Sequence, residues 1–254
     1  MSTERKNIVI TGASAGLGEG MAREFAAKGR NLALCARRTD RLAALAKELT
    51  EAHPDITVTT KALDVTDTDA VFRVFREFRD ELGGIDRVIA NAGLGKGQPI
   101  GTGYFEANKQ TIETNVIGLL AQCEAAMEIF REQEAGHLVV VSSVSAVRGM
   151  RGNVTTYAAS KAAAASLAEG IRAQHLSKDT AGIAVTTLLP GYIESEMTGR
   201  ANKTPLMVSG EKGAKALVSA IEAEKAKAYV PWWPWTVLAQ VLRFAPLSLV
   251  RKLS

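Results

Sequence analysis

The regular alternation of two kinds of segment along the chain constrains the fold more than any other feature of the sequence. Seven short runs of β-branched and other apolar residues have the length and composition of buried strands. They are Asn7 to Thr11, Asn31 to Ala36, Ile56 to Leu63, Ile85 to Ala90, His137 to Ser142, Ile183 to Leu189 and Ala228 to Val230. The segments between them carry apolar residues at helical spacing, as at Leu42, Leu45, Ala46 and Leu49. Because a crossover helix packs back onto the sheet it left, the alternation predicts an α/β, doubly wound fold: a parallel seven-stranded sheet with helices on both faces.

The last part of the chain differs in composition from the rest. No repeat or linker interrupts residues 1–230, which are predicted to form a single domain. Residues 231–254 contain all three tryptophans and an apolar run. Because this run includes the charged Arg243 and is interrupted by Pro246, it is too short to span a membrane. The sequence leaves two interpretations of this Trp/Pro-rich amphipathic tail: a segment that lies on a membrane surface, or a lid or subunit interface beside the substrate cleft.

Charge and cysteine content disfavour several kinds of protein. The 31 basic and 27 acidic residues leave a net charge of +4, and the basic residues are scattered, which disfavours a nucleic-acid partner. The two cysteines, Cys35 and Cys123, have neither metal-ligand nor redox spacing and are predicted to be plain core residues. No signal-peptide-like run precedes the first strand, so a reducing, cytoplasmic location is expected. If the tail lies on a membrane surface, the protein is expected to be cytoplasmic and membrane-associated.

A glycine-rich loop follows the first predicted strand. Residues 11–18 read TGASAGLG, and Met21, Phe25 and Ala26 then show helical spacing. Glycines allow a sharp turn and a close approach of the backbone to phosphates, and a helix N-terminus attracts negative charge. The spacing differs from the general G-x-G-x-x-G fingerprint, but the position between strand and helix is that of a pyrophosphate site. The alternative is an ordinary tight strand-to-helix turn.

The end of the second predicted strand bears on the choice of cofactor. Arg37 and Arg38 stand where the adenosine ribose lands in this topology, and the first acid is Asp40, which better suits a helix cap. A carboxylate would accept hydrogen bonds from a free 2′-hydroxyl, whereas guanidinium groups bind a 2′-phosphate. The sequence therefore favours NADP(H) over NAD(H), with Arg37 as the better candidate for the phosphate ligand. The alternative is that both arginines merely line the start of a helix.

These features resemble the short-chain dehydrogenase/reductase family, and further segments in the family's order extend the resemblance across nearly the whole chain. The loop at 11–18 matches the family's TGxxxGxG form. The other matching segments are Leu63-Asp64-Val65 (an adenine contact), Asn91-Ala92-Gly93 (the NAG motif), Asn115 followed by Gly118 (the catalytic asparagine), Ser142-Ser143, Tyr157 to Lys161 (YxxxK), and Pro190 to Ser195 (the PG segment that holds the nicotinamide).

The resemblance implies a Rossmann fold in which residues 1–230 bind a dinucleotide and carry the catalytic site. Together with the two arginines, it implies the cofactor-binding residues Gly12, Ser14, Ala15, Gly16, Leu17, Gly18, Arg37, Arg38, Asp64, Val65, Asn91, Ala92, Gly93, Tyr157, Lys161, Pro190, Gly191, Ile193 and Ser195. It implies the catalytic residues Asn115, Ser143, Tyr157 and Lys161. It also implies a homodimer or homotetramer, and no metal is expected at the site.

Tyr157 and Lys161 are four residues apart on a run with helical spacing, so both project from one helix face. An adjacent ammonium, joined by an oxidised nicotinamide, is expected to lower the pKa of Tyr157 toward working pH. Tyr157 can then donate a proton to a carbonyl oxygen or accept one from an alcohol. The resemblance gives Lys161 the further role of binding the nicotinamide ribose, and gives Asn115 a place in a proton relay through water.

The serine is the weakest match. The resemblance implies that Ser143 hydrogen-bonds the substrate oxygen, but the segment from Ser143 to Tyr157 is one residue longer than the family's usual spacing. Ser142 and Ser145 therefore stay open as alternatives. Ser195 stands where the family commonly has threonine, and the serine retains the hydroxyl group.

The sequence thus predicts an oxidoreductase that transfers hydride between NADP(H) and a carbonyl or secondary alcohol. The apolar tail and the loop from Met197 to Pro205 favour a hydrophobic small-molecule substrate. Two alternatives remain: an NADP-binding redox-sensing or scaffold protein without turnover, and an NAD-dependent alcohol dehydrogenase.

Overall fold

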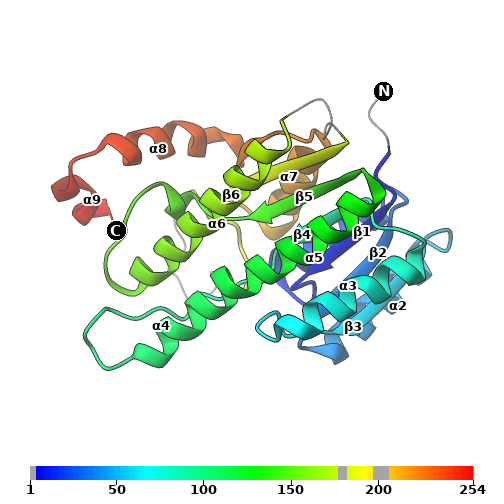
Figure 1. The fold of residues 1–254 in the computed structure, drawn as a ribbon. Coiled ribbons are helices and arrows are strands. Elements are labelled where there is room, and N and C mark those ends of the chain that lie inside the picture. The colour runs from blue at the N-terminus through cyan, green and yellow to red at the C-terminus, as the bar shows by residue number, and fades with distance from the viewer. Residues whose placement is uncertain (1–3, 177–181, 197–205, 254) are drawn as a thin grey trace.

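A seven-stranded parallel sheet forms the centre of the protein (Figure 1). The computed structural model describes residues 4–176, 182–196 and 206–253, so the loop from Met197 to Pro205 lies outside the described residues. The strands are β1 Asn7–Thr11, β2 Asn31–Ala36, β3 Val58–Ala62, β4 Arg87–Ala90, β5 Gly136–Val141, β6 Ile183–Pro190 and β7 Lys227–Val230. Their order is β3-β2-β1-β4-β5-β6-β7, and all neighbours pair in parallel. The predicted sheet is confirmed, with some strand ends shifted by one or two residues.

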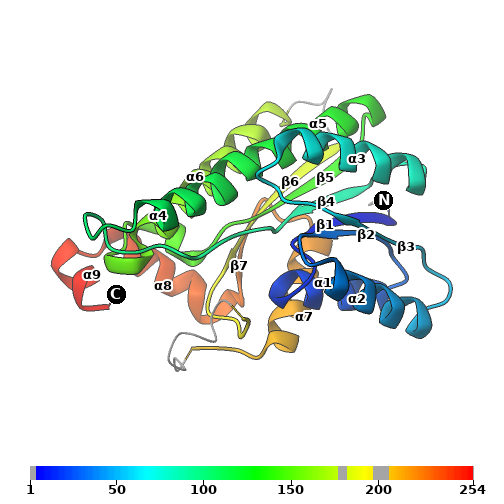
Figure 2. The same cartoon turned by 90° about the horizontal axis from the view of Figure 1, so that it is seen from below.

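Helices cover both faces of the sheet. The α-helices are α1 Gly16–Ala26, α2 Thr39–Ala52, α3 Thr68–Leu82, α4 Phe105–Ile112, α5 Gly118–Gln133, α6 Thr155–Gln174, α7 Gly210–Glu222, α8 Trp232–Phe244 and α9 Leu247–Leu253. Shorter turns are the π-helix η1 Glu113–Ile117 and the 3₁₀ turns η2 Val144–Val147 and η3 Gly152–Val154. Figure 2 shows α1, α2 and α7 on one face and α3, α5 and α6 on the other. The predicted doubly wound fold is confirmed.

Alternate residues of each strand enter different hydrophobic cores. In β1, Ile8 and Ile10 pack with the helices α1, α2 and α7, whereas Val9 packs with α3, α5 and α6. This follows from the two-residue period of a strand that is buried on both faces. Cys35 and Cys123 are free and buried in the core beside α3 and α5, as predicted.

Two helix starts near the site differ in how they are capped. The Asp67 side chain caps α3, because it accepts a hydrogen bond of 3.0 Å from the Ala70 amide. Asp40 was expected to cap α2, and this expectation is wrong. The backbone carbonyl of Arg38 already accepts the first helical bond, from Leu42, so Arg38 is the N-cap residue and Asp40 lies in the first turn. The Asp40 carboxylate still lies near the positive end of the α2 dipole.

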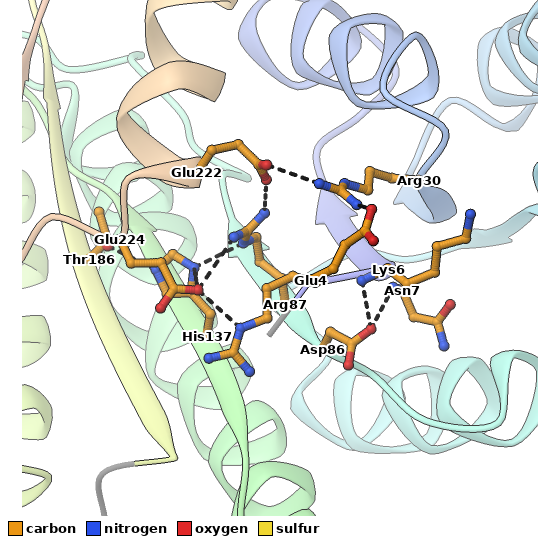
Figure 3. Close-up of polar contacts among 11 residues, drawn as sticks. Glu4, Lys6, Asn7, Arg30, Asp86, Arg87, His137, Thr186, Glu222 and Glu224 are labelled. Atoms are coloured by element: carbon orange, nitrogen blue, oxygen red, sulfur yellow. Dashed lines mark hydrogen bonds and ion pairs between the residues drawn. The ribbon is translucent and has the colours of Figure 1, made fainter. Parts of the chain in front are cut away.

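A buried polar network occupies the amino-terminal edge of the sheet (Figure 3). Arg87, the first residue of β4, is almost completely buried and donates through Nε to His137 Nδ1 at 2.9 Å. Its guanidinium group also bonds Glu222 and lies 3.6 Å from a carboxylate oxygen of Glu224. Arg30 reaches the other oxygen of Glu222 at 3.1 Å. The network therefore ties β4, β5 and the end of α7 together at the edge opposite the carboxyl ends of the strands.

His137 is neutral in this network. Burial lowers the pKa of its imidazole well below the ordinary value, and the charges of Arg87 and Arg5 lower it further. Because Arg87 donates to Nδ1, that nitrogen is the acceptor, and Nε2 carries the hydrogen that is donated to Thr186 Oγ1 at 2.8 Å. Both ring nitrogens are thus paired without a charge on the ring.

Candidate active site

The glycine loop is held in place by the end of the neighbouring strand. Thr11, the last residue of β1, accepts hydrogen bonds on Oγ1 from the amides of Asn91 and Ala92, each at 3.0 Å. Asn91 in turn donates through its side-chain amide to the Thr11 carbonyl at 2.9 Å. Gly12 adopts φ +64°, a left-handed conformation, and a Cβ there would lie 2.9 Å from Ala92 Cα. Both features require glycine at the first turn of the loop.

A cavity of about 450 Å³ lies at the carboxyl ends of the strands, next to this loop. Of the residues predicted to bind the cofactor, those that line it are Gly12, Ser14, Ala15, Gly16, Leu17, Arg37, Arg38, Asp64, Val65, Asn91, Ala92, Gly93, Tyr157, Lys161, Pro190, Gly191, Ile193 and Ser195. Ser143 lines it as well. These segments directly follow six different strands or begin a neighbouring helix, which is where open α/β sheets bind ligands.

Gly18, which was predicted to bind the cofactor, is not among the residues that line the cavity. A Cβ at Gly18 would lie 2.4 Å from the Gly12 carbonyl oxygen and 2.7 Å from the side-chain nitrogen of Asn91. Glycine at this position therefore lets α1 pack closely beneath the loop. Its effect on a ligand is indirect, through the shape of the loop.

The two arginines after β2 differ in their surroundings. Arg38 donates through Nε to the Ser14 hydroxyl of the glycine loop at 3.3 Å and through Nη1 to Glu196 at 2.9 Å. Arg37, whose side chain is 67% exposed, lies 3.6 Å from Asp64. Both line the cavity, but Arg38 is held against the loop. A phosphate group bound here would lie between Ser14 and two guanidinium groups, a donor set suited to a dianion.

Tyr157 and Lys161 lie on the same face of α6, as predicted, and the Lys161 ammonium is 5.8 Å from the centre of the Tyr157 ring. The ammonium donates to the Val141 carbonyl at 2.9 Å. Burial lowers the pKa of Lys161 to about 8. Desolvation raises the pKa of Tyr157, and the Ser143 hydroxyl partly opposes this rise through a hydrogen bond. Without a cofactor, Tyr157 is thus a neutral phenol at neutral pH, because burial raises its pKa. The lowering of this pKa beside an oxidised nicotinamide stays a prediction.

The three serines after β5 are distinguished by their partners. Ser142 is buried and donates to the Lys161 backbone carbonyl at 2.7 Å, so its hydroxyl helps to fix α6 against the strand. Ser143 lines the cavity and accepts hydrogen bonds from the Ser145 amide at 3.2 Å and hydroxyl at 3.0 Å. Ser145 is not among the residues that line the cavity. Ser143 is therefore the serine whose hydroxyl lies beside Tyr157 on the cavity wall, where it can reach a ligand.

Asn115 lies in the π-helix η1, one turn that interrupts the run from α4 into α5. Its side chain is buried behind the cavity wall: Oδ1 accepts from the Leu94 amide at 2.7 Å, and Nδ2 donates to the Leu94 carbonyl and to the Ser160 hydroxyl, each at 2.9 Å. Asn115 therefore joins the segment after β4 to α6. π-Bulges of this kind frequently occur at functional sites.

Sequence reasoning missed the contribution of Glu196 and Arg41. The Glu196 carboxylate bridges Arg38 and Arg41, and these two guanidinium groups lower the pKa of Glu196 to about 2. Arg41 could have been found, because residues three apart at a helix start share a face. Glu196 could not, because it meets the arginines from a distant part of the chain. Four more cavity-lining residues were not predicted: Cys35, Ala36, Thr114 and Val141. Leu63, from the matched segment after β3, and Ser142, one of the alternative serines, line the cavity as well.

Comparison with known proteins identifies this arrangement. A family model described as short chain dehydrogenase matches residues 6–206. The chain belongs to the short-chain dehydrogenase family. It is therefore an oxidoreductase that acts on CH–OH or C=O groups with a nicotinamide cofactor.

Its relatives include uncharacterized oxidoreductases of several bacteria. One, from Mycobacterium tuberculosis strain H37Rv, is 53% identical over 248 residues, which cover 98% of this chain and 97% of the relative. Another, from Myxococcus xanthus, is 34% identical and covers 89% of this chain and 88% of its own length. Both alignments extend beyond the part that the family model matches, so the similarity includes much of the carboxyl-terminal region.

Solved structures of the same fold include cofactor complexes. A short-chain dehydrogenase from Sphingobium yanoikuyae in complex with NADPH superposes with a TM-score of 0.81 at 27% identity, over 96% of this chain and 94% of that one. An alcohol dehydrogenase from Thermococcus sibiricus complexed with 5-hydroxy-NADP gives 0.78 at 27% identity, over 89% and 96%.

In residues 4–176, 182–196 and 206–253, no helix is long and apolar enough to cross a membrane. The same part of the chain holds no group of three or more His, Cys, Asp or Glu residues that could bind a metal ion.

Proposed function

We propose that this short-chain dehydrogenase is specific for NADP(H) and interconverts a hydrophobic carbonyl compound and its secondary alcohol, with Tyr157 as proton donor and acceptor. The observation that carries the proposal is the position of Ser143, Tyr157 and Lys161 on the wall of the cavity that also contains the glycine loop. A substrate oxygen within reach of Tyr157 and Ser143 would thus lie beside the bound dinucleotide.

The cavity fits a dinucleotide in shape and charge. No side chain among the described residues caps the amino end of α1, where Gly16 and Leu17 line the cavity, so backbone amides there are available to a pyrophosphate. Gly16 has φ +57°, which lets the loop open its amides toward the cavity. When bound, the nicotinamide supplies or accepts the hydride.

The residues of the chain would supply binding, orientation and proton transfer. Tyr157, a neutral phenol at neutral pH, gives its proton to the carbonyl oxygen during reduction and becomes a phenolate. In the reverse direction the phenolate takes the proton from the alcohol hydroxyl and becomes a phenol again. Ser143 donates a hydrogen bond to the same oxygen and stabilises its developing negative charge. Lys161 places a positive charge beside the phenol and favours the phenolate that forms. Asn115 bonds Ser160 and thereby helps to position α6. Its proposed place in a water relay that returns a proton to Tyr157 rests on the family resemblance.

The arginines and Ser14 support NADP(H) over NAD(H). Replacing Arg38 by alanine is expected to weaken NADPH binding by about 10- to 100-fold, since a charge-assisted hydrogen bond contributes about 1.5–3 kcal/mol. NADH binding should change little, because NADH carries no 2′-phosphate. Fluorescence titration of both cofactors measures the two affinities. The same titration of Arg37→Ala ranks the two arginines: a larger loss than in Arg38→Ala would make Arg37 the principal ligand, as the sequence predicts.

Arg76→Ala is a suitable control for these titrations, because Arg76 is paired with Glu128 on the outer surface, away from the cavity. It should bind both cofactors as the wild type does. A wild-type protein that binds NADH more tightly than NADPH would contradict the proposed specificity.

The proposed reaction is tested by two measurements on the unmodified protein. NADPH fluorescence reports binding, and a panel of hydrophobic ketones and aldehydes with NADPH reports turnover through loss of absorbance. Oxidation of NADPH that depends on a carbonyl compound is the expected result. Tight binding of NADPH without turnover of any substrate in the panel or of the corresponding alcohols with NADP⁺ would instead favour a redox-sensing or scaffold protein.

A further inference from the structure

Helix α8 presents apolar side chains on two opposite sides. On the inner side Trp235 and Ala239 are buried, and Trp235 packs against Gly191 so closely that a Cβ on Gly191 would lie 2.1 Å from the indole. On the outer side Val237, Val241 and Phe244 follow one another at helical spacing and are exposed to solvent. An exposed apolar stripe on an otherwise well-packed helix indicates a contact outside the folded domain.

Neighbouring residues extend this stripe into a larger surface. Trp232 and Trp233 are exposed at its start and Leu247 at its end. We call Trp232, Trp233, Val237, Val241, Phe244 and Leu247 the C-terminal apolar face. Figures 1 and 2 both put α8 and α9 at the same end of the molecule as α4. At the start of α4, Tyr104 and Phe105 are also exposed. The end of the protein beyond the carboxyl ends of the strands is therefore rich in exposed aromatic and aliphatic groups.

The charged side chains of the segment that carries the C-terminal apolar face are of one sign. Residues 231–254 contain three Lys or Arg and no Asp or Glu. The Arg243 guanidinium lies 5.9 Å from the centre of the exposed Phe244 ring. Arg148, from the loop after β5, donates to the Arg243 carbonyl at 2.8 Å, which brings a further cation to the same helix end. Aromatic groups next to cations, without acids, are typical of helices that lie in a membrane interface.

The single sign of charge argues against a second copy of the chain as the occupant. In a two-fold symmetric dimer through this face, Arg243 would meet its own copy, with no Asp or Glu of residues 231–254 to pair with it. Lipid headgroups with negative charge provide the missing partner, and the acyl boundary accepts the tryptophan, valine and phenylalanine side chains. We infer that the C-terminal apolar face binds the surface of a bilayer that contains anionic lipids.

This contact would lie next to the active site. Trp235, which anchors α8, contacts Gly191 of the cavity wall and stacks edge-on with Tyr192 at 5.2 Å. It also packs with Val144, directly after Ser143. A protein held on a bilayer by the outer side of α8 would thus have its catalytic cavity near the membrane surface. Binding to the bilayer itself does not depend on the proposed reaction.

Co-sedimentation of the full chain with lipid vesicles tests the inference. The probes are phosphatidylcholine vesicles with and without about 30% phosphatidylglycerol. The wild type is expected to sediment with the anionic vesicles, less with the neutral ones, and less at high salt. Val241→Ser combined with Phe244→Ser should weaken binding to the anionic vesicles by at least about tenfold, because two large apolar groups no longer enter the interface. Arg243→Gln should reduce only the preference for anionic lipid.

Leu176→Ser is the matched control. Leu176 is 77% exposed and Phe244 79%, but Leu176 follows α6 at the other end of the molecule, so its variant should sediment as the wild type does. The circular dichroism of all variants should match the wild type, because each changed side chain is exposed. Equal vesicle binding by the wild type and Val241→Ser/Phe244→Ser, or no binding by either, would overturn the inference. The inference would also be overturned if light scattering showed a dimeric wild type and a monomeric double variant while neither bound vesicles. That result would assign the face to a second copy of the chain.

Discussion

Replacing Tyr157 by phenylalanine is expected to lower kcat/KM for carbonyl reduction by a factor of about 10² to 10⁴, the usual contribution of a positioned general acid. The substitution removes only the hydroxyl group, and the ring keeps its place on α6 beside Lys161. No other phenol lines the cavity among the described residues, so none can take over proton donation. The measurement is the initial rate of NADPH oxidation with the best substrate of the carbonyl panel.

Two accompanying measurements make this prediction specific. NADPH affinity should change far less than the rate, because the glycine loop and the arginines are untouched. Tyr229→Phe is the matched control: Tyr229 is half-buried on β7 and does not line the cavity, so its variant should keep wild-type activity. If Tyr157→Phe kept a wild-type rate with intact NADPH binding, the proton would have to come from another group, and the proposed mechanism would be wrong.

The second large effect is on stability. Replacing Arg87 by methionine is expected to lower the free energy of unfolding by about 3–5 kcal/mol, the usual loss when one partner of a buried ion pair is removed. Arg87 is 2% exposed, forms ion pairs with Glu222 and Glu224, and donates a hydrogen bond to His137. Burial alone would raise the pKa of Glu222, but Arg87 and Arg30 hold this pKa below its ordinary value. In the methionine variant, only Arg30 of these two cations is left to stabilise the Glu222 carboxylate. Urea unfolding followed by circular dichroism measures the loss.

Arg76→Met is a closely matched control for this experiment. Both arginines pair with a glutamate and lie over a phenylalanine ring, Arg76 at 5.9 Å from Phe72 and Arg87 at 5.7 Å from Phe25. They differ in burial, since the Arg76 side chain is 51% exposed. Arg76→Met should therefore cost less than about 1 kcal/mol. Similar losses in the two variants would mean that the buried network adds no more to stability than a surface ion pair.

The amino acid pattern of the strands was enough to predict the sheet. Apolar runs such as Ile8 to Ile10 and Leu138 to Val141 bury residues on both faces, which is possible only in a strand covered by helices on each side. Asp67 could likewise be expected at the start of α3, because capping depends on residues only three apart. Asp40 was misjudged as a cap because Arg38, Thr39 and Asp40 are all polar residues that can precede a helix. The backbone hydrogen bond to the Arg38 carbonyl decides among them.

Within the site, the sequence was enough to identify the residues that follow each strand, because their positions depend only on local spacing. The glycine loop, Tyr157 and Lys161 could be named in this way. Only the tertiary structure separated Ser142, which bonds the Lys161 carbonyl, from Ser143, which lines the cavity, because the two differ in long-range partners and not in chemistry. Desolvation of Tyr157 was equally invisible in the sequence, because it depends on what packs around the phenol.

Long-range ion pairs mark the limit of what the sequence determined. Glu196 reaches Arg38 and Arg41 from the far side of the cavity, and Glu222 reaches Arg87 from the end of α7. A charged residue on a polar surface has many partners available to it in an unfolded chain, and nothing in its local spacing selects one. The strand alternation and the glycine loop therefore determined the fold and the place of the site. The folded arrangement alone decided which charges meet there and which side of α8 faces outward.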